Sequence, residues 1–267
     1  MFLRASIFLS LFVLTGCDEP LTFTQVCKET PGLCNDLNID DSHCKDLRAD
    51  VIVARYHEYK QPTDENKYIL LKGFEKYDHC VASAAKIEQI KSKEKTTSRV
   101  NGHLTSLKEI TRLYQDTKNT DHPGLLYYHW SRKNDQTALT KLLALENDPS
   151  VADDAEMQFF LASYYIKFDE EKTIDLLFRT LELNKPNHIL NPEIYTTLVS
   201  LFYKHEKYKH AYMFAKVAQL SGITNIQISP IAQKLTSEGK ELSDLDTLAQ
   251  KTYDNIESGQ FVSPDKL

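Results

Sequence analysis

Apolar residues between positions 123 and 222 recur with a nearly constant step. Leu125 is followed by Leu161 after 36 residues, and Leu161 by Leu198 after 37. Three further series keep this step: Ala138, Ile174 and Ala211; Leu142, Phe178 and Ala215; Leu145, Leu181 and Ala218. Because four series share one step, this region is predicted to contain three similar structural units, as repeat proteins do.

Each unit has the pattern of two short helices joined by a turn. The expected pairs are 123–132 with 136–146, 153–167 with 171–184, and 192–204 with 208–220. Asn134-Asp135 is a turn, Asn191 precedes a proline at a helix start, and Gly222 is a typical helix stop. The surplus residues of each unit fit in loops at 148–151 and 188–191. The region is therefore predicted to form three stacked helical hairpins.

Helical spacing continues on both sides of the repeats. Apolar stripes occur at Leu47, Val51 and Ala54, at Leu70, Phe74, Tyr77, Val81 and Ala84, and at Leu104, Leu107, Ile110 and Tyr114. The polar segment 92–102 is predicted to be a solvated helix end and loop. Ser229-Pro230 opens a short helix, and Ser243 with Asp246 has the spacing of a capping box before a last helix that caps the stack. The fold class is therefore predicted to be all-α.

Composition agrees with a helical, globular chain. The 267 residues are 41% hydrophobic and 26% charged, with only 8 Gly and 9 Pro, so the chain can bury a core as one elongated domain or two small ones. The net charge of -6 leaves no basic footprint for nucleic acid, and we exclude that class of partner.

The first 16 residues have the features of a signal peptide. Arg4 supplies a positive start, and residues 5–14 form an apolar run that is too short to span a bilayer as a helix. The next residues, Leu14-Thr15-Gly16-Cys17, resemble the lipobox of bacterial lipoproteins. An ordinary secretory signal with a chance cysteine is the alternative.

The lipobox resemblance implies that the signal is cut before Cys17, which then carries acyl chains. Several chains on one residue give stable membrane anchoring. The mature protein is then expected to face the periplasm of a bacterial cell envelope. Asp18-Glu19 looks like the inner-membrane retention signal of enterobacterial lipoproteins, which favours the inner over the outer membrane.

Four further cysteines, Cys27, Cys34, Cys44 and Cys80, predict two disulfides with three connectivities. Cys44 and Cys80 each lie 18 residues from Pro62, so an antiparallel helix pair that turns there brings their sulfurs together. Cys27 and Cys34 flank the turn dipeptide Pro31-Gly32 and are expected to close a short loop. The alternative is a zinc site that uses His43 and His79, although adjacent residues on a helix point in different directions.

The hairpins resemble the tetratricopeptide family, most plainly in Leu161-Ala162-x-x-Tyr165 followed by Ile174, Phe178, Leu181 and Pro186. The family's small first-helix residue is Leu126, Ala162 and Val199 here, and its early tryptophan is missing. The resemblance implies that the first helix of each pair lines a groove that binds a peptide. Its groove positions correspond to Tyr127, Trp130, Phe159, Ser163, Ile166, Lys167, Ser200, Tyr203 and Lys204. The alternative is that Tyr127 and Trp130 are core residues where the repeats meet the N-terminal helices.

As a whole, the chain is similar to a family of uncharacterised gammaproteobacterial lipoproteins, a domain of unknown function. The likeness is carried by the lipobox, the four cysteines, residues 125–131 and Ala211-Tyr212. It implies fold and location but no activity. The expected organisation is a signal peptide (1–16), a tether (17–26), a disulfide-bonded helical region (27–120), the repeats (121–222), and capping helices with a tail (223–267).

The sequence contains no motif for catalysis. It has no glycine-rich phosphate loop, no Gly-x-Ser-x-Gly elbow and no His-Glu-x-x-His pair. We therefore expect a non-enzymatic scaffold, without cofactor or metal, that binds an envelope protein or peptide through its helical groove. The alternative is an envelope enzyme or small-ligand receptor whose site includes His122 and His129.

Overall fold

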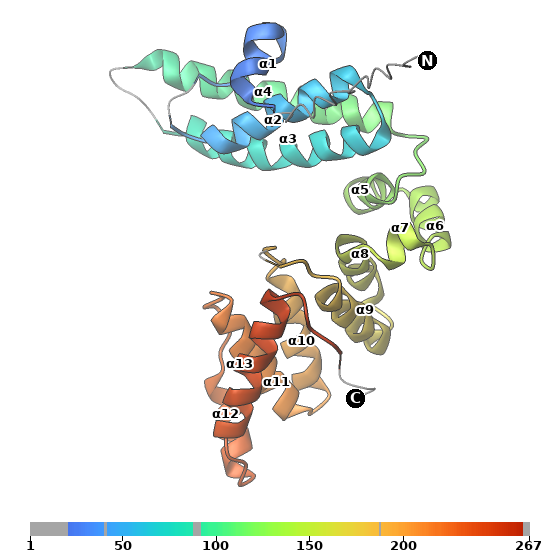
Figure 1. The fold of residues 1–267 in the computed structure, drawn as a ribbon, viewed down its shortest axis with the longest axis vertical. Helices are drawn as coiled ribbons and strands as arrows, with labels where there is room; N and C mark the ends of the chain where they lie inside the picture. The colour runs from blue at the N-terminus through green and yellow to red at the C-terminus, as the bar shows by residue number, and fades with distance from the viewer. Residues whose placement is uncertain (1–20, 40–41, 88–91, 187, 264–267) are drawn as a thin grey trace, which may run out of the picture. The chain divides into compact units, whose positions relative to one another are not determined.

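The computed structural model, drawn in Figure 1, describes residues 21–39, 42–87, 92–186 and 188–263. These residues form thirteen α-helices and one short 3-10 helix, and they contain no strand. The predicted all-α fold is confirmed. The chain divides into two compact units, residues 1–119 and 120–267, which are described separately below.

The first unit is built on three long helices, α2 (Lys45–Lys60), α3 (Asp64–Ala85) and α4 (Lys93–Asp116), with α3 packed against both of the others. The short α1 (Phe23–Glu29) and the 3-10 helix η1 (Pro31–Leu33) contact α2. The turn between α2 and α3 ends at Thr63, whose hydroxyl accepts a hydrogen bond from the Asn66 amide and caps α3. The side chains buried in α3 include the whole predicted stripe: Leu70, Phe74, Tyr77, Val81 and Ala84.

Two disulfides fasten this unit, and both predicted pairings are confirmed. Cys44 is bonded to Cys80 and Cys27 to Cys34, with Cα–Cα distances of 5.9 and 5.8 Å. We call these the long and the short disulfide. Cys44 directly precedes α2 and Cys80 lies near the end of α3, so the helical hairpin brings them together. The zinc alternative is wrong, because these sulfurs are bonded to each other.

The predicted loop at 92–102 is also wrong, because α4 begins at Lys93 and runs through it. Arg99 is only 1% exposed and donates a hydrogen bond to the Ala84 carbonyl oxygen at 3.0 Å, so the α3 end satisfies this charged residue. Leu104, from the predicted apolar stripe, is instead 56% exposed. The buried face of α4 therefore combines the polar or small residues Arg99, Gly102 and Ser106 with the apolar Leu113.

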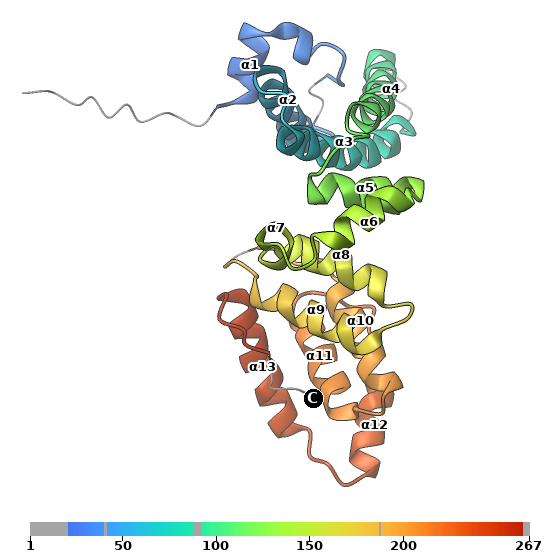
Figure 2. The same ribbon diagram turned by 90° about the vertical axis from the view of Figure 1, so that its right-hand side faces the viewer.

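The second unit is a row of helical pairs. Its helices are α5 (Pro123–Lys133), α6 (Gln136–Ala144), α7 (Pro149–Ala152), α8 (Ala155–Tyr165), α9 (Glu170–Glu182), α10 (Glu193–Lys204), α11 (Tyr208–Leu220), α12 (Ser229–Ser237) and α13 (Ser243–Glu257). α5 packs on α6, α8 on α9 and α10 on α11, as Figure 2 shows. α5 also contacts α8, and α9 contacts α10. The predicted hairpins are confirmed, and they stack in chain order.

Most of the repeated apolar positions lie in the core of this stack, whereas Leu145 and Ile174 are only partly buried against it. Leu125, Leu161 and Leu198 are all fully buried, although 73 residues separate the first from the last (198 − 125). Ala211 and Ala218 of α11 are fully buried as well. The constant step in the sequence therefore reflects equivalent packing positions in successive hairpins.

Two local details differ from the expectation. The predicted loop at 148–151 contains the helix α7, because the Asp148 carboxylate accepts the Ser150 amide and Val151 is fully buried. The predicted capping box of α13 is absent, since its N-cap is Leu242 without a side-chain cap. The Asp246 carboxylate instead accepts a hydrogen bond from the Tyr212 hydroxyl at 2.9 Å, which fixes α13 on α11.

No helix in the described part of the chain is both long and apolar enough to cross a membrane. The predicted signal peptide and the predicted acylation site, Cys17, lie outside the described residues.

Candidate functional site

Aromatic side chains gather where α5 meets α8. Tyr127 and Trp130 are three residues apart on α5, while Phe160 and Tyr164 are four apart on α8, so each pair shares one helix face. Phe168 follows one further turn of chain after Tyr164. We call these five residues the aromatic row.

The rings of the aromatic row join two consecutive hairpins. Tyr127 is stacked on Phe160, with ring centroids 3.6 Å apart and planes 4° from parallel. Trp130 meets Tyr164 edge-to-face at 5.4 Å, and Tyr164 meets Phe168 in the same way at 4.9 Å. Such pairs contribute about 0.5–1.5 kcal/mol each beyond area burial. The first rings of the row therefore hold α5 against α8, and the row then continues past the end of α8 to Phe168.

The far end of the row is open to solvent. Phe168 is 61% exposed, whereas Trp130 and Tyr164 are half-buried. The neighbouring Lys167 is exposed and makes no ion pair within the described ranges. An apolar ring beside a cation suits a partner segment that carries an apolar side chain and a carboxylate.

The other predicted groove residues of the second hairpin lie next to the row. The Ser163 hydroxyl oxygen lies 3.4 Å from that of Tyr127 and donates to the Phe160 carbonyl oxygen at 2.7 Å. Phe159 contacts Phe160 with centroids 6.3 Å apart, and Ile166 is half-buried at the end of α8. The structure thus brings together the predicted residues of the first two hairpins.

The predicted residues of the third hairpin make other contacts. The Ser200 hydroxyl donates to the Thr196 carbonyl oxygen within α10, and Tyr203 meets Tyr208 edge-to-face at 5.4 Å. Lys204 forms an ion pair with Glu170 of α9. A carboxylate of a partner would therefore have to compete with Glu170 of this chain for Lys204.

Glu170 connects the second and third hairpins electrostatically. Its other carboxylate oxygen lies 2.9 Å from His205 Nε2. The hydrogen bond from Lys204, with a further contribution from His205, lowers the pKa of Glu170. The ionised form of Glu170, which pairs with Lys204, therefore persists to a lower pH than for a free glutamate.

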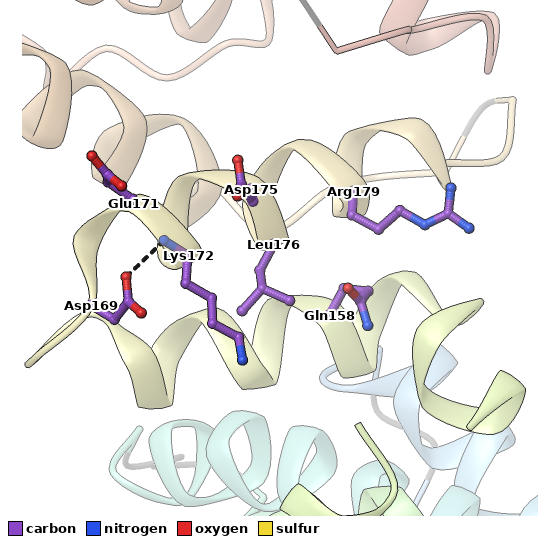
Figure 3. Close-up of a pocket in the computed structure, with 7 residues that line it drawn as sticks. All are labelled: Gln158, Asp169, Glu171, Lys172, Asp175, Leu176 and Arg179. Carbon is purple, nitrogen blue, oxygen red and sulfur yellow. Dashed lines mark hydrogen bonds between the residues drawn. The ribbon is translucent and has the colours of Figure 1, made fainter. Parts of the chain in front are cut away.

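A hollow of about 540 Å³ lies along α9, with Gln158 of α8 on its other side (Figure 3). Its cations are already paired: Lys172 with Glu146, and Arg179 with Asp153 at 2.9 Å. The Lys172 ammonium also lies 3.9 Å from the centre of a neighbouring aromatic ring. These contacts fix α9 to the preceding hairpin. The charged residues of this hollow therefore have a structural role, and we do not propose it as a binding site.

The two histidines of the alternative site have separate positions. The His122 ring is the N-cap of α5, where Nδ1 accepts a hydrogen bond from the Leu125 amide at 3.4 Å, and His129 is buried. Neither histidine lines the hollow along α9, and neither lines the hollow in the first unit that is described below. Within the described residues, no three His, Cys, Asp or Glu side chains are grouped to hold a metal ion.

The sequence analysis did not predict Phe160, Tyr164 and Phe168, which are three of the five residues of the aromatic row. Their spacing of four and four residues is a signal that could have found them, because such residues share a helix face. The tetratricopeptide positions instead selected Phe159 and Lys167, which flank the row.

Comparison with known proteins places the chain in a family without assigning chemistry. Residues 14–216 match the family described as "Protein of unknown function (DUF2989)". No curated protein and no solved structure matches the chain.

Proposed function

Because the chain belongs to the DUF2989 family, whose description records no function, we propose its function from the arrangement of its helices. The protein is a lipid-anchored envelope protein that binds a segment of another protein along its helical hairpins. It is a scaffold and not an enzyme. The observation that carries this proposal is the aromatic row, with Phe168 exposed at its end.

The contacts within the row support binding rather than simple core packing. A buried core encloses its aromatic rings, whereas here the ring that ends the series is 61% exposed. Trp130 and Tyr164 are half-buried and held edge-to-face, so they are already ordered before a partner arrives. Rigid aromatic anchors lose little entropy on binding and are enriched among residues that dominate interface energies.

The stacked hairpins also support a tetratricopeptide-like mode of binding. In this proposal α5 presents the partner with Trp130, and the turn that follows α8 presents Lys167 and Phe168. The partner segment has an apolar side chain for the rings and an acidic residue for the lysine. The buried interface area and the binding affinity then depend on how much of α10, including Tyr203, the partner segment also covers.

The membrane anchor is the second part of the proposal. It rests on the lipobox-like residues 14–17 and on the resemblance to gammaproteobacterial lipoproteins, which together favour acylated Cys17, a periplasmic position and the inner membrane. Replacement of Cys17 by Ser tests this part. The expected result is loss of labelled palmitate and release of the protein from the membrane fraction.

Crosslinking in living cells tests the binding surface. A photoreactive phenylalanine analogue at position 168 should give one discrete adduct with an envelope protein. The same analogue at Ile189, which is 92% exposed in the same unit, is the matched control and should give no such adduct. The adduct at 168 should fall when Trp130→Ala is combined with Lys167→Glu.

Two outcomes would contradict the binding proposal. Identical adducts at 168 and 189 would mean that position 168 reports only random collisions. An adduct unaffected by Trp130→Ala with Lys167→Glu would mean that a partner binds elsewhere on the unit.

A further inference from the structure

A second hollow, of about 610 Å³, lies in the first unit where the described chain begins. Its walls come from α2, from α3 and from the residues around the start of α1. The apolar residues that line it include Leu21, Phe23, Val53 and Ile69. Ile69 is 48% exposed, so this surface leaves apolar side chains in contact with water.

Polar and charged residues border the apolar side chains of this surface. Asp50 and His57 line the hollow and are exposed. Lys60 continues the stripe formed by Val53 and His57 at helical spacing, and its ammonium lies over the Tyr56 and Tyr59 rings at 5.2 and 5.7 Å. Tyrosine and lysine side chains of this kind are typical of the membrane–water interface, where one end is apolar and the other is wet.

The length of chain before this surface restricts what can cover it. Leu21, which lines the hollow, is four residues after Cys17. Four residues span at most about 14 Å even when fully extended. If Cys17 carries acyl chains in a bilayer, Leu21 and the hollow must lie within that distance of the membrane.

We propose that this surface of the first unit rests on the phospholipid bilayer, with Phe23 and Ile69 inserted between the headgroups. This inference depends on the acylation of Cys17 in the proposed function and adds a specific orientation to it. Insertion of an apolar face of this kind reaches about 5–10 Å into the boundary between headgroups and acyl chains. The unit is then fixed on the membrane instead of moving freely on a tether.

Quenching by brominated lipids tests the proposal with the full-length acylated protein in phosphatidylethanolamine and phosphatidylglycerol vesicles. Trp130, the only tryptophan, is replaced by Phe, and a new tryptophan is introduced as Ile69→Trp or Phe23→Trp. Leu104→Trp is the control, because Leu104 is a similarly exposed apolar residue of the same unit but does not line the hollow. Flotation of the vesicles reports anchoring independently.

The expected result is flotation of every variant, with a clear loss of emission at positions 69 and 23 and little loss at 104, as for groups inserted about 5–10 Å deep. Flotation without quenching at 69 and 23 refutes the docking but leaves the anchor intact. Quenching at 104 alone also refutes it, because another face then meets the lipid. Absence of flotation refutes both the anchor and the docking.

Discussion

The substitution Gly102→Ala probes the glycine of the first unit at which an added methyl group would meet the closest neighbours. A Cβ added to Gly102 would lie 2.4 Å from the Tyr77 hydroxyl oxygen and 3.0 Å from the Asn38 backbone nitrogen. Both neighbours are fully buried. The Tyr77 hydroxyl donates to Asn38 Oδ1 at 2.7 Å and accepts from the Asn38 amide at 3.0 Å. The methyl group therefore cannot enter without moving this hydroxyl out of both hydrogen bonds.

The expected cost follows from three contributions. Overpacking of a tight core costs about 1–3 kcal/mol, and a buried polar group left unsatisfied costs about 1–3 kcal/mol. Alanine is favoured over glycine in a helix by about 1 kcal/mol, which opposes the loss. We therefore expect Gly102→Ala to lower the free energy of unfolding of the first unit by about 1–5 kcal/mol.

Gly73→Ala is the matched control in the neighbouring helix α3. The added Cβ would meet only Val51 Cγ2, at an ordinary contact distance of 3.5 Å, so the helix preference should raise stability by about 0.5–1 kcal/mol. Tyr77→Phe removes the hydroxyl that obstructs the methyl group. In that background Gly102→Ala should cost about 1–2 kcal/mol less, as coupled neighbours do.

Hydrogen exchange of the α3 and α4 amides in increasing urea measures these changes within the first unit. Fluorescence is not suitable, because the single tryptophan, Trp130, is in the other unit. The reasoning is refuted if Gly102→Ala is as stable as Gly73→Ala, or if Tyr77→Phe leaves the cost of Gly102→Ala unchanged.

Two further predictions concern acid and the disulfides. Lys204 lowers the pKa of Glu170 in the folded protein. The stabilisation of the fold by this ion pair is therefore complete above the ordinary glutamate pKa, and it is lost as the pH falls through the lower pKa of the folded state. A carbon NMR titration of Glu170 should show this low pKa, and Lys204→Met should raise it; an unchanged titration would contradict the ion pair. The long disulfide closes 36 residues and the short one 7, so replacing each pair by alanine should cost about 4 and about 2.5 kcal/mol respectively by chain entropy. Thermal unfolding measures both, and equal losses would contradict this ranking.

Local pattern was enough to predict most of the helices and both disulfides. The step from Leu125 to Leu161 to Leu198 identified the hairpins, because equivalent buried positions recur when each hairpin packs on the hairpins next to it. The turn at Pro62 placed Cys44 opposite Cys80 for a similar reason, since a short turn fixes which residues of two antiparallel helices meet. Such information can be read from the periodicity of the sequence and from the positions of its turns.

The surroundings of the predicted groove residues were only partly predictable, because these positions came from a family pattern that ignores individual neighbours. Tyr127 and Trp130 do lie in the aromatic row, but their ring partners are Phe160 and Tyr164. Lys204 was correctly placed near a helix end, yet the sequence could not indicate that Glu170 of the preceding hairpin would pair with it.

By itself, then, the sequence determined the helices, their pairing in the repeats and the covalent links, because these depend on periodicity and on where the turns lie. Tertiary structure alone decided that α4 buries Arg99 and Gly102 while it exposes Leu104. The physical reason is that the helix has two faces. Which face turns inward depends on the groups of α3 that it contacts, here the Ala84 carbonyl and the Tyr77 hydroxyl, and not on hydrophobicity alone.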